Sequence, residues 1–193
     1  SIKVVQRTEI PIDVNALKGQ IDDSLIQVNA LMSTYDPDSE LSQLNKTAAG
    51  IPFPISEQTE FVLREAIRLH NLSRGSLDVT VGPLVNLWGF GPDKRAEVIP
   101  TKSQLLEIAD YVGIDKFEMN SGVVTKLHSK LYIDLSTIAK GYGVDAVADI
   151  VEENLIGDYL IEVGGEMRVA GIKANGNEGR IAIEKPITNE RAI

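Results

Sequence analysis

The stretch that decides the fold class runs from residue 131 to residue 171 and reads LYIDLSTIAKGYGVDAVADIVEENLIGDYLIEVGGEMRVAG. Residues 131–135 are predicted to form a strand, and apolar residues then recur at helical spacing over residues 136–154. Two more strands are predicted at residues 159–163 and 166–171. A helix packed on antiparallel strands is an α+β arrangement, so the sequence predicts an α+β fold.

Further strand signals lie on both sides of this stretch. Residues 116–119 and 123–128 are predicted strands that would form a meander with residues 131–135, and another strand is predicted at residues 179–184. The sequence has no internal repeat and no Pro/Gly/Ser-rich linker. We therefore expect residues 1–193 to form a single domain.

The N-terminal half is predicted to be mainly helical. A long amphipathic helix is predicted over residues 14–32, with Asp13 as its N-cap. A polar, turn-forming segment follows, so the chain is expected to leave this helix near Tyr35. A second helix is predicted over residues 56–73, and Gly75 provides its C-terminal stop.

The composition excludes several classes of function. The 193 residues include 19 Lys and Arg against 28 Asp and Glu, and this net charge of -9 argues against nucleic-acid binding. The absence of cysteine excludes disulfides, thiolate metal sites and cysteine nucleophiles. The longest uncharged run, residues 79–92, is too short and too interrupted by Gly and Pro to span a bilayer. The sequence begins at Ser1 without signal-peptide features, so we expect a processed or engineered N-terminus.

The titratable residues give few indications of chemistry. His70 and His128 are the only histidines, and they lack the spacing of a metal site, so both are expected to be structural or surface residues. Asp78 and Asp134 could supply paired carboxylates for acid–base work. The sequence does not show whether these two carboxylates meet.

Residues 141–146 read GYGVDA and match the dinucleotide-binding pattern G-x-G-x-x-A, with Glu162 following at the distance of a ribose-binding acid. That pattern requires its first glycine directly after a strand, whereas residues 136–140 look helical. We expect instead that these glycines let a helix approach a sheet closely, and that the motif does not bind a nicotinamide dinucleotide.

Two backbone sites could receive an anion. Gly164 and Gly165 would form either a hairpin turn or a phosphate-binding turn. Asp134, Ser136 and the residues after them lie at a predicted helix start, where free amides suit an anion but an N-capped helix is an equal alternative.

Four segments together resemble the FAD:protein FMN transferases, also called the ApbE family. In family order they are residues 32–45 (MSTYDPDSELSQLN), 77–92 (LDVTVGPLVNLWGFGP), 134–142 (DLSTIAKGY) and 163–165 (VGG). The second and third are the most specific. The resemblance implies an ApbE-like, T-fold-like domain of antiparallel strands packed with helices, incomplete at both ends.

The resemblance implies a Mg²⁺-dependent enzyme that cleaves FAD, attaches FMN through its phosphate to a Thr of an acceptor flavoprotein and releases AMP. The acceptor would be a subunit of a redox-driven ion pump or a related flavoprotein. The family resemblance also implies a periplasmic inner-membrane lipoprotein that touches the membrane only through a lipid anchor. Two alternatives stay open, a FAD pyrophosphatase that yields FMN and AMP, and a non-catalytic flavin-binding module.

The resemblance also implies roles for individual residues, although it assigns no catalytic residue. The expected FAD-contacting residues are Tyr35, which would lie beside the flavin, Ser76, Leu77, Asp78 and Lys140. Thr137 would offer its backbone carbonyl to Mg²⁺, which prefers oxygen ligands and bridges phosphate oxygens.

The sequence departs from the family pattern at both ends. It lacks an early Met-Gly-Thr segment that contacts FAD in family members. It also lacks the family's C-terminal region, which carries an Asp and a Ser or Thr that bind the metal. We therefore expect the truncated chain to hold an incomplete metal site.

Overall fold

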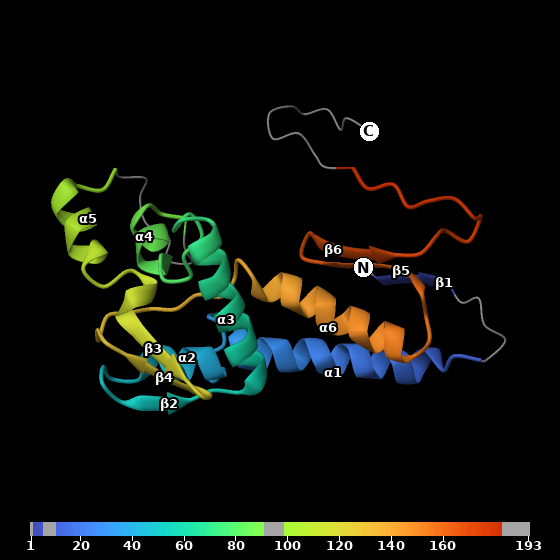
Figure 1. Cartoon of the computed structure of the whole chain (residues 1–193), viewed down its shortest axis with the longest axis horizontal. Coiled ribbons are helices and arrows are strands. Elements are labelled where there is room, and N and C mark those ends of the chain that lie inside the picture. Colours follow the sequence, from blue (N-terminus) through green and yellow to red (C-terminus); the bar gives the residue numbers. More distant parts are fainter. Residues whose placement is uncertain (1, 6–10, 91–98, 183–193) are drawn as a thin grey trace. The chain divides into compact units, whose positions relative to one another are not determined.

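The computed structural model describes residues 2–5, 11–90 and 99–182 (Figure 1). Its contacts divide the chain into two compact units, one of Ser1–Asp22 with Val144–Ile193 and one of Asp23–Gly143. Each unit contains a three-stranded antiparallel sheet together with helices, which confirms the predicted α+β class. The single domain expected over the whole chain stays a prediction.

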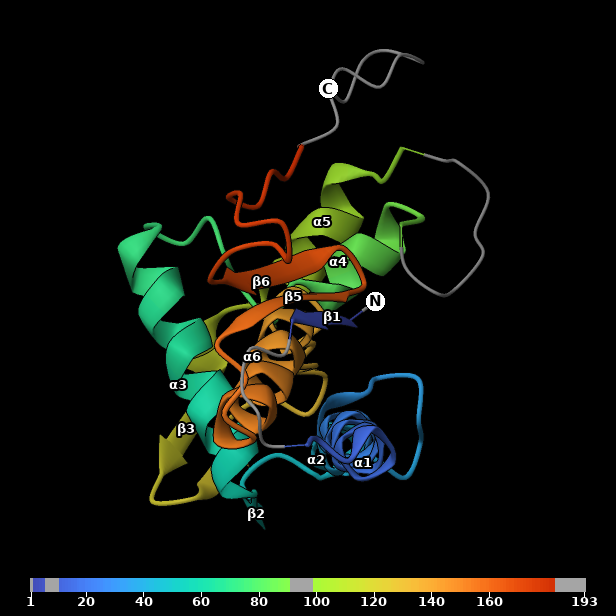
Figure 2. The same ribbon diagram turned by 90° about the vertical axis from the view of Figure 1, so that its right-hand side faces the viewer.

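The first unit contains a sheet and parts of helices α1 (Val14–Met32) and α6 (Ala139–Glu153). In spatial order the strands of this sheet are β1 (Ile2–Val5), β5 (Asp158–Val163) and β6 (Glu166–Ala170). Strands β5 and β6 form the predicted hairpin, and its turn residues Gly164 and Gly165 have φ angles of 60° and 101°. Glycine adopts such angles without steric cost. Figure 2 shows this sheet over helix α6.

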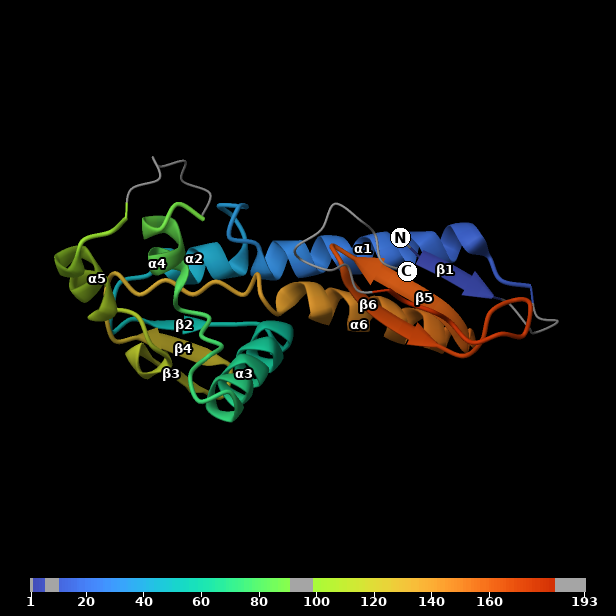
Figure 3. The same cartoon turned by 90° about the horizontal axis from the view of Figure 1, so that it is seen from above.

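The second unit contains a different sheet and most of the helices. In spatial order its strands are β2 (Pro52–Pro54), β4 (Val123–Lys126) and β3 (Phe117–Asn120). Its helices, besides parts of α1 and α6, are α2 (Glu40–Lys46), α3 (Glu57–Leu72), α4 (Gly82–Leu87), α5 (Lys102–Ala109) and the 3₁₀ turn η1 (Ile114–Lys116). Figure 3 shows α3 beside the sheet. The buried core joins Leu41 and Leu44 of α2 to Val62 and Leu63 of α3 and Val124 of β4.

Both helices predicted in the N-terminal half are present. Helix α1 spans the predicted residues, and the Asp13 carboxylate accepts hydrogen bonds of 3.0 Å from two amides of its first turn. Helix α3 ends at Leu72, and the amide of Gly75, which has a φ of 84°, donates to the His70 carbonyl. No helix in the described part of the chain is long and apolar enough to cross a membrane.

The strand predicted at residues 131–135 is wrong, and with it the predicted meander. Leu131, Ile133 and Leu135 are buried alternately, as they would be in a strand, but the segment joins neither sheet of the described residues. The remaining place beside β4 belongs to β2, which was not predicted because a three-residue strand with two prolines carries little strand signal.

Two further segments also differ from the sequence prediction. The helix predicted from residue 136 begins at Ala139, because residues 136–138 form a turn. For the strand predicted at 179–184, residues 179–182 are exposed and lie outside the strands of the described chain, while the last two residues lie outside the described residues.

Candidate functional site

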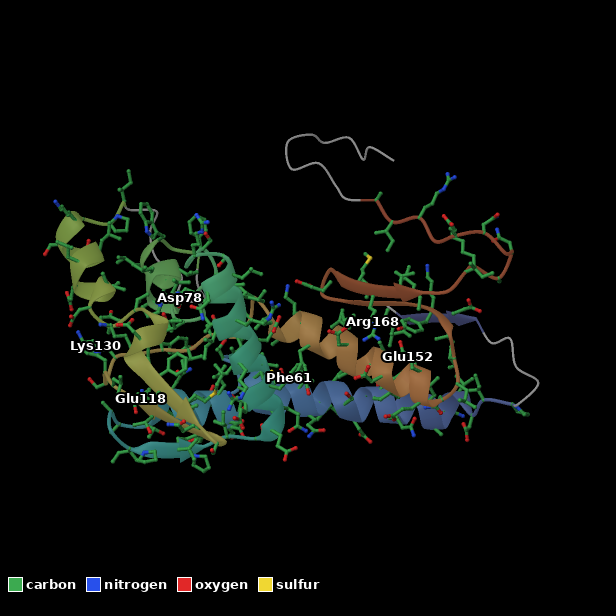
Figure 4. The ribbon with its side chains drawn as sticks, in the orientation of Figure 1. Phe61, Asp78, Glu118, Lys130, Glu152 and Arg168 are labelled. Atoms are coloured by element: carbon green, nitrogen blue, oxygen red, sulfur yellow. The ribbon has the colours of Figure 1, made fainter. Side chains whose placement is uncertain are left out.

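A cavity of about 260 Å³ in the second unit collects several residues that the sequence singled out. Its lining comes from three segments far apart in the sequence, within residues 34–35, 78–90 and 132–137. Asp78 lies beside helix α4 (Figure 4). Larger hollows lie elsewhere on the described surface, but this cavity is lined by two Asp side chains, Asp78 and Asp134, together with aromatic and hydroxyl side chains.

Three of the six residues assigned by resemblance line this cavity together. They are Tyr35, from the loop after α1, Asp78, from the loop before α4, and Thr137, from the turn before α6. Asp134 lines it as well, so the two carboxylates that the sequence could not pair share one cavity.

The other three assigned residues do not line the cavity. Ser76 and Leu77 directly precede Asp78, with Ser76 exposed and Leu77 half-buried. Lys140 is exposed in the first turn of α6. Their contact with FAD therefore stays a prediction.

The loop that carries Asp78 is held by hydrogen bonds on both sides. Asp78 Oδ1 accepts from the amide of Thr80 at 2.8 Å and from its hydroxyl at 2.6 Å. The buried Thr80 hydroxyl in turn accepts from the amide of Gly113 at 2.7 Å. On the other side, His70 Nδ1 lies 2.8 Å from the Leu77 carbonyl. The same ring nitrogen lies 3.6 Å from Asp78 Oδ2, so His70 contacts the loop that carries Asp78, and its expected structural role stays a prediction.

The second histidine lies outside the cavity lining. The His128 ring stacks on Tyr111 with 5.4 Å between centroids, and its Nδ1 accepts from the amide of Lys130 at 3.1 Å. These contacts agree with the expected structural role of His128.

The turn before α6 is held by Asp134. Its Oδ1 accepts from the amide of Ser136 at 2.8 Å and from the Ser136 hydroxyl, and its own amide donates to the Val79 carbonyl at 2.7 Å. The Ser136 amide is thus already bound by a carboxylate. Because this contact lies in the turn before Ala139, the two alternatives for the helix start both stay predictions.

The cavity offers oxygen ligands of the kind that Mg²⁺ prefers. Asp134 and Asp78 bring carboxylates to the lining, and Thr137 lines the cavity as well, so that the contact of its carbonyl with a metal stays a prediction. Among the described residues, however, no three His, Cys, Asp or Glu side chains gather closely enough to hold a metal ion. The residues present therefore fit part of a magnesium site, which needs about six ligands in total.

An aromatic residue that the sequence reasoning did not assign also lines the cavity. Phe90 is 83% exposed and Tyr35 is 79% exposed, although both line the same hollow. Large exposed aromatic side chains are informative because folding normally buries them. The signal available in the sequence was the aromatic pair of Trp88 and Phe90 separated by Gly89, within the family-like segment 77–92.

The glycines of the dinucleotide-like motif lie inside helix α6. A Cβ at Gly143 would lie 3.7 Å from Leu25 and 4.0 Å from Val28, both on helix α1. The expected close approach to a sheet is therefore wrong, because the neighbour is a helix. Glu162 accepts instead from the amide of Gly165 at 2.9 Å, and this hydrogen bond lowers the pKa of Glu162.

Comparison with known proteins extends these observations to the whole chain. The model of the ApbE family matches residues 1–193. The FAD:protein FMN transferase of Vibrio cholerae serotype O1 is 47% identical over 193 residues, which cover 100% of this chain and 58% of that protein. The FAD:protein FMN transferase of Haemophilus influenzae is 49% identical over 180 residues, which cover 90% of this chain and 52% of that protein.

Solved structures give the same result. The flavin transferase ApbE from Vibrio cholerae superposes with a TM-score of 0.90 at 49% identity, over 96% of this chain and 60% of that one. The apo flavinyl transferase ApbE of Pseudomonas stutzeri superposes with a TM-score of 0.88 at 32% identity, over 97% of this chain and 60% of that one. The chain thus spans somewhat more than half the length of these relatives.

Proposed function

Because the chain belongs to the ApbE family, we propose that this protein is a FAD:protein FMN transferase. Its relatives of 47% and 49% identity carry that name. The observation that carries the proposal is the cavity that combines exposed aromatic residues with two Asp residues. A flavin dinucleotide needs both kinds of surface, because its isoalloxazine is a flat aromatic ring system and its pyrophosphate is charged.

The aromatic side of the cavity would receive the isoalloxazine. Tyr35 and Phe90 offer ring faces or edges, and Val81 and Val85 add apolar lining between the polar groups. Aromatic contacts contribute about 0.5–1.5 kcal/mol beyond the burial of area. Binding of the ring system would also remove these exposed side chains from water, which adds a hydrophobic contribution.

The polar side of the cavity would face the pyrophosphate. In the proposed reaction the oxygen of an acceptor Thr hydroxyl bonds to the FMN phosphorus and the bridging P–O bond breaks. AMP leaves with the bridging oxygen, and the hydroxyl proton passes to solvent or to a nearby base. Asp78 and Asp134 are the carboxylates placed at this cavity.

A magnesium ion is part of the proposal, since phosphoryl transfer gathers negative charge at the reacting oxygens. The Thr137 carbonyl, with Asp134 beside it in the lining, would contribute to holding the ion. When bound, Mg²⁺ would supply positive charge that offsets the negative charge developing as the P–O bond breaks.

The cellular setting is proposed on family membership alone. We infer a periplasmic protein held at the inner membrane by a lipid anchor, and an acceptor that is a flavoprotein subunit of a redox-driven ion pump or a related flavoprotein. Fractionation of cells that express the whole gene would test the location, because recovery in the cytoplasmic fraction would contradict it.

The experiment that tests the function incubates the protein with FAD, Mg²⁺ and a Thr-containing acceptor peptide, followed by mass spectrometry. We expect the peptide to gain the mass of FMN as AMP is released. Release of free FMN with an unmodified peptide would indicate a FAD pyrophosphatase. Unchanged FAD that nevertheless binds would indicate a flavin-binding module.

Two variants test the cavity itself. Tyr35→Ala should weaken FAD binding several-fold, in line with the loss of about 1 kcal/mol of aromatic contact. Phe61→Ala is the matched control, because Phe61 is an exposed aromatic residue outside the cavity lining (Figure 4). Equal dissociation constants for the two variants in a fluorescence titration would show that the flavin does not contact Tyr35 in this cavity.

A further inference from the structure

The side chain of Asn45, in the last turn of helix α2, binds the backbone of a residue 88 positions away. Its Nδ2 donates to the Ile133 carbonyl at 2.8 Å, and its Oδ1 accepts from the Ile133 amide at 2.8 Å. The side-chain amide of Asn45 thus binds both the N–H and the carbonyl of Ile133. Residues of an antiparallel pair exchange hydrogen bonds in the same way.

This bidentate contact lies directly behind the cavity wall. Ile133 is fully buried, whereas its two neighbours Tyr132 and Asp134 both line the cavity. In an extended segment alternate side chains point to opposite faces. A shift of the Ile133 backbone would therefore move Tyr132 and Asp134 together.

The side chain of Lys126, which is buried, in turn holds the backbone of Asn45. Lys126 is 1% exposed, and its Nζ donates to the Asn45 carbonyl at 2.7 Å and, at 3.4 Å, to the carbonyls of Ser129 and Leu131. On the other side, the Asp134 amide donates to the Val79 carbonyl at 2.7 Å. The wall is therefore fixed by contacts from separate parts of the chain.

We propose that Asn45 is a positioning residue for the cavity. Its side-chain amide takes the place of a neighbouring strand and sets where Tyr132 and Asp134 face the ligand. This assignment deepens the proposed function, on which its ligand readout rests. Asn45 does not line the cavity, so its effect on the ligand passes through the backbone of Ile133.

The test compares Asn45→Ala and Asn45→Asp with Leu44→Ala. Asn45→Asp keeps the shape and the acceptor for the Ile133 amide but replaces the donor with an oxygen that repels the Ile133 carbonyl. Leu44 is the adjacent, fully buried residue, and its truncation lowers stability without touching that contact. All proteins are assayed at a temperature where circular dichroism shows that they are fully folded.

Two readouts are taken from each protein, amide hydrogen exchange at Ile133 and the dissociation constant for FAD. We expect both Asn45 variants to bind FAD about tenfold more weakly, as the loss of one or two hydrogen bonds would give. We expect the Ile133 amide to exchange faster in Asn45→Ala but to stay protected in Asn45→Asp, which keeps its acceptor. Leu44→Ala should change FAD binding less than twofold, because its effect falls on global stability.

Equal loss of FAD affinity in the Asn45 variants and in Leu44→Ala would overturn the proposal, because a purely structural role predicts that result. If the unchanged protein fails to bind FAD, the proposed function fails and the exchange readout decides alone. Faster exchange confined to Ile133 and Asp134 in Asn45→Ala would then support the positioning role. Unchanged exchange at both amides would contradict it.

Discussion

Two segments of this chain carry a similar pattern of buried apolar residues and fold differently. Strand β5 buries Tyr159 and Ile161 and pairs with β1 on one side and with β6 on the other. Residues 131–135 bury every second side chain as well, yet they join no sheet of the described chain. Their backbone is bound instead by the side chain of Asn45 and by the Val79 carbonyl.

The comparison separates two properties that a sequence pattern combines. Alternation reports which side chains are buried, whereas the partners of the backbone groups depend on other parts of the chain. A sheet gives each residue a neighbouring strand and leaves few polar groups for other uses. A segment held at a few points can present Tyr132 and Asp134 to a cavity, as residues 131–135 do.

The largest expected effect comes from truncating the two matched core residues. Ile133→Ala and Ile161→Ala should each lower the free energy of unfolding by about 3 kcal/mol, because both side chains are fully buried. Urea unfolding measures both losses. If the cavity depends on the first segment alone, only Ile133→Ala should also weaken FAD binding. If Ile161→Ala weakened FAD binding equally, the cavity would not depend specifically on residues 131–135.

The next largest effect is expected from replacing Lys126, the buried cation behind the cavity wall. Lys126→Met keeps an unbranched chain but leaves three carbonyls without their donor, so the free energy of unfolding should fall by about 2 kcal/mol. Lys130→Met is the control, since Lys130 is exposed and its ammonium contacts Glu107 and the ring of Tyr111 at the surface. Equal urea midpoints for the two variants would show that Lys126 does not brace this segment.

The hairpin of the first unit offers a smaller effect. Gly165 has a φ of 101°, so Gly165→Ala should cost about 1 kcal/mol of stability through backbone strain. Gly157→Ala serves as the control, because Gly157 has no positive φ and a Cβ there meets no atom within 4 Å. A thermal midpoint that falls equally in both variants would contradict the strained turn.

The smallest effect is a pH dependence. Burial lowers the pKa of Lys126 below its ordinary value of 10.5, so the unfolded chain binds the proton more tightly than the folded chain. Stability due to this group should therefore rise as the pH increases through the folded pKa toward 10.5. Comparison with Lys126→Met removes the contribution of other titrating groups. The unfolding free energy of the unchanged protein should rise with pH relative to that of Lys126→Met. A relative fall would contradict a lowered pKa for Lys126.

Local chemistry allowed some of the fold to be predicted. Asp13 at the start of α1, Gly75 after α3 and the turn of Gly164 and Gly165 act within a few residues of the features they determine. The strand β2 was missed because two of its three residues are proline, and it exists through its pairing with β4. No local signal at residues 131–135 reports a partner as distant as Asn45.

In the candidate site, too, the features that depend on distant parts of the chain could not be predicted from local sequence. Tyr35, Asp78 and Thr137 were assigned by family resemblance, and the fold brings them to one cavity from separate segments. Composition and spacing alone could not have joined them. Phe90 was missed because a loop aromatic has no periodicity, and its significance comes from exposure at the cavity.

The close approach of helix α4 to the cavity wall has a consequence for how related sequences can change. Gly82 is buried, and a Cβ at this position would lie only 3.0 Å from the ring of Tyr132. Any larger residue at 82 needs a smaller or displaced side chain at 132. Positions 82 and 132 should therefore covary among homologues, and a Gly82→Ala change should be tolerated best by a chain that already lacks the tyrosine.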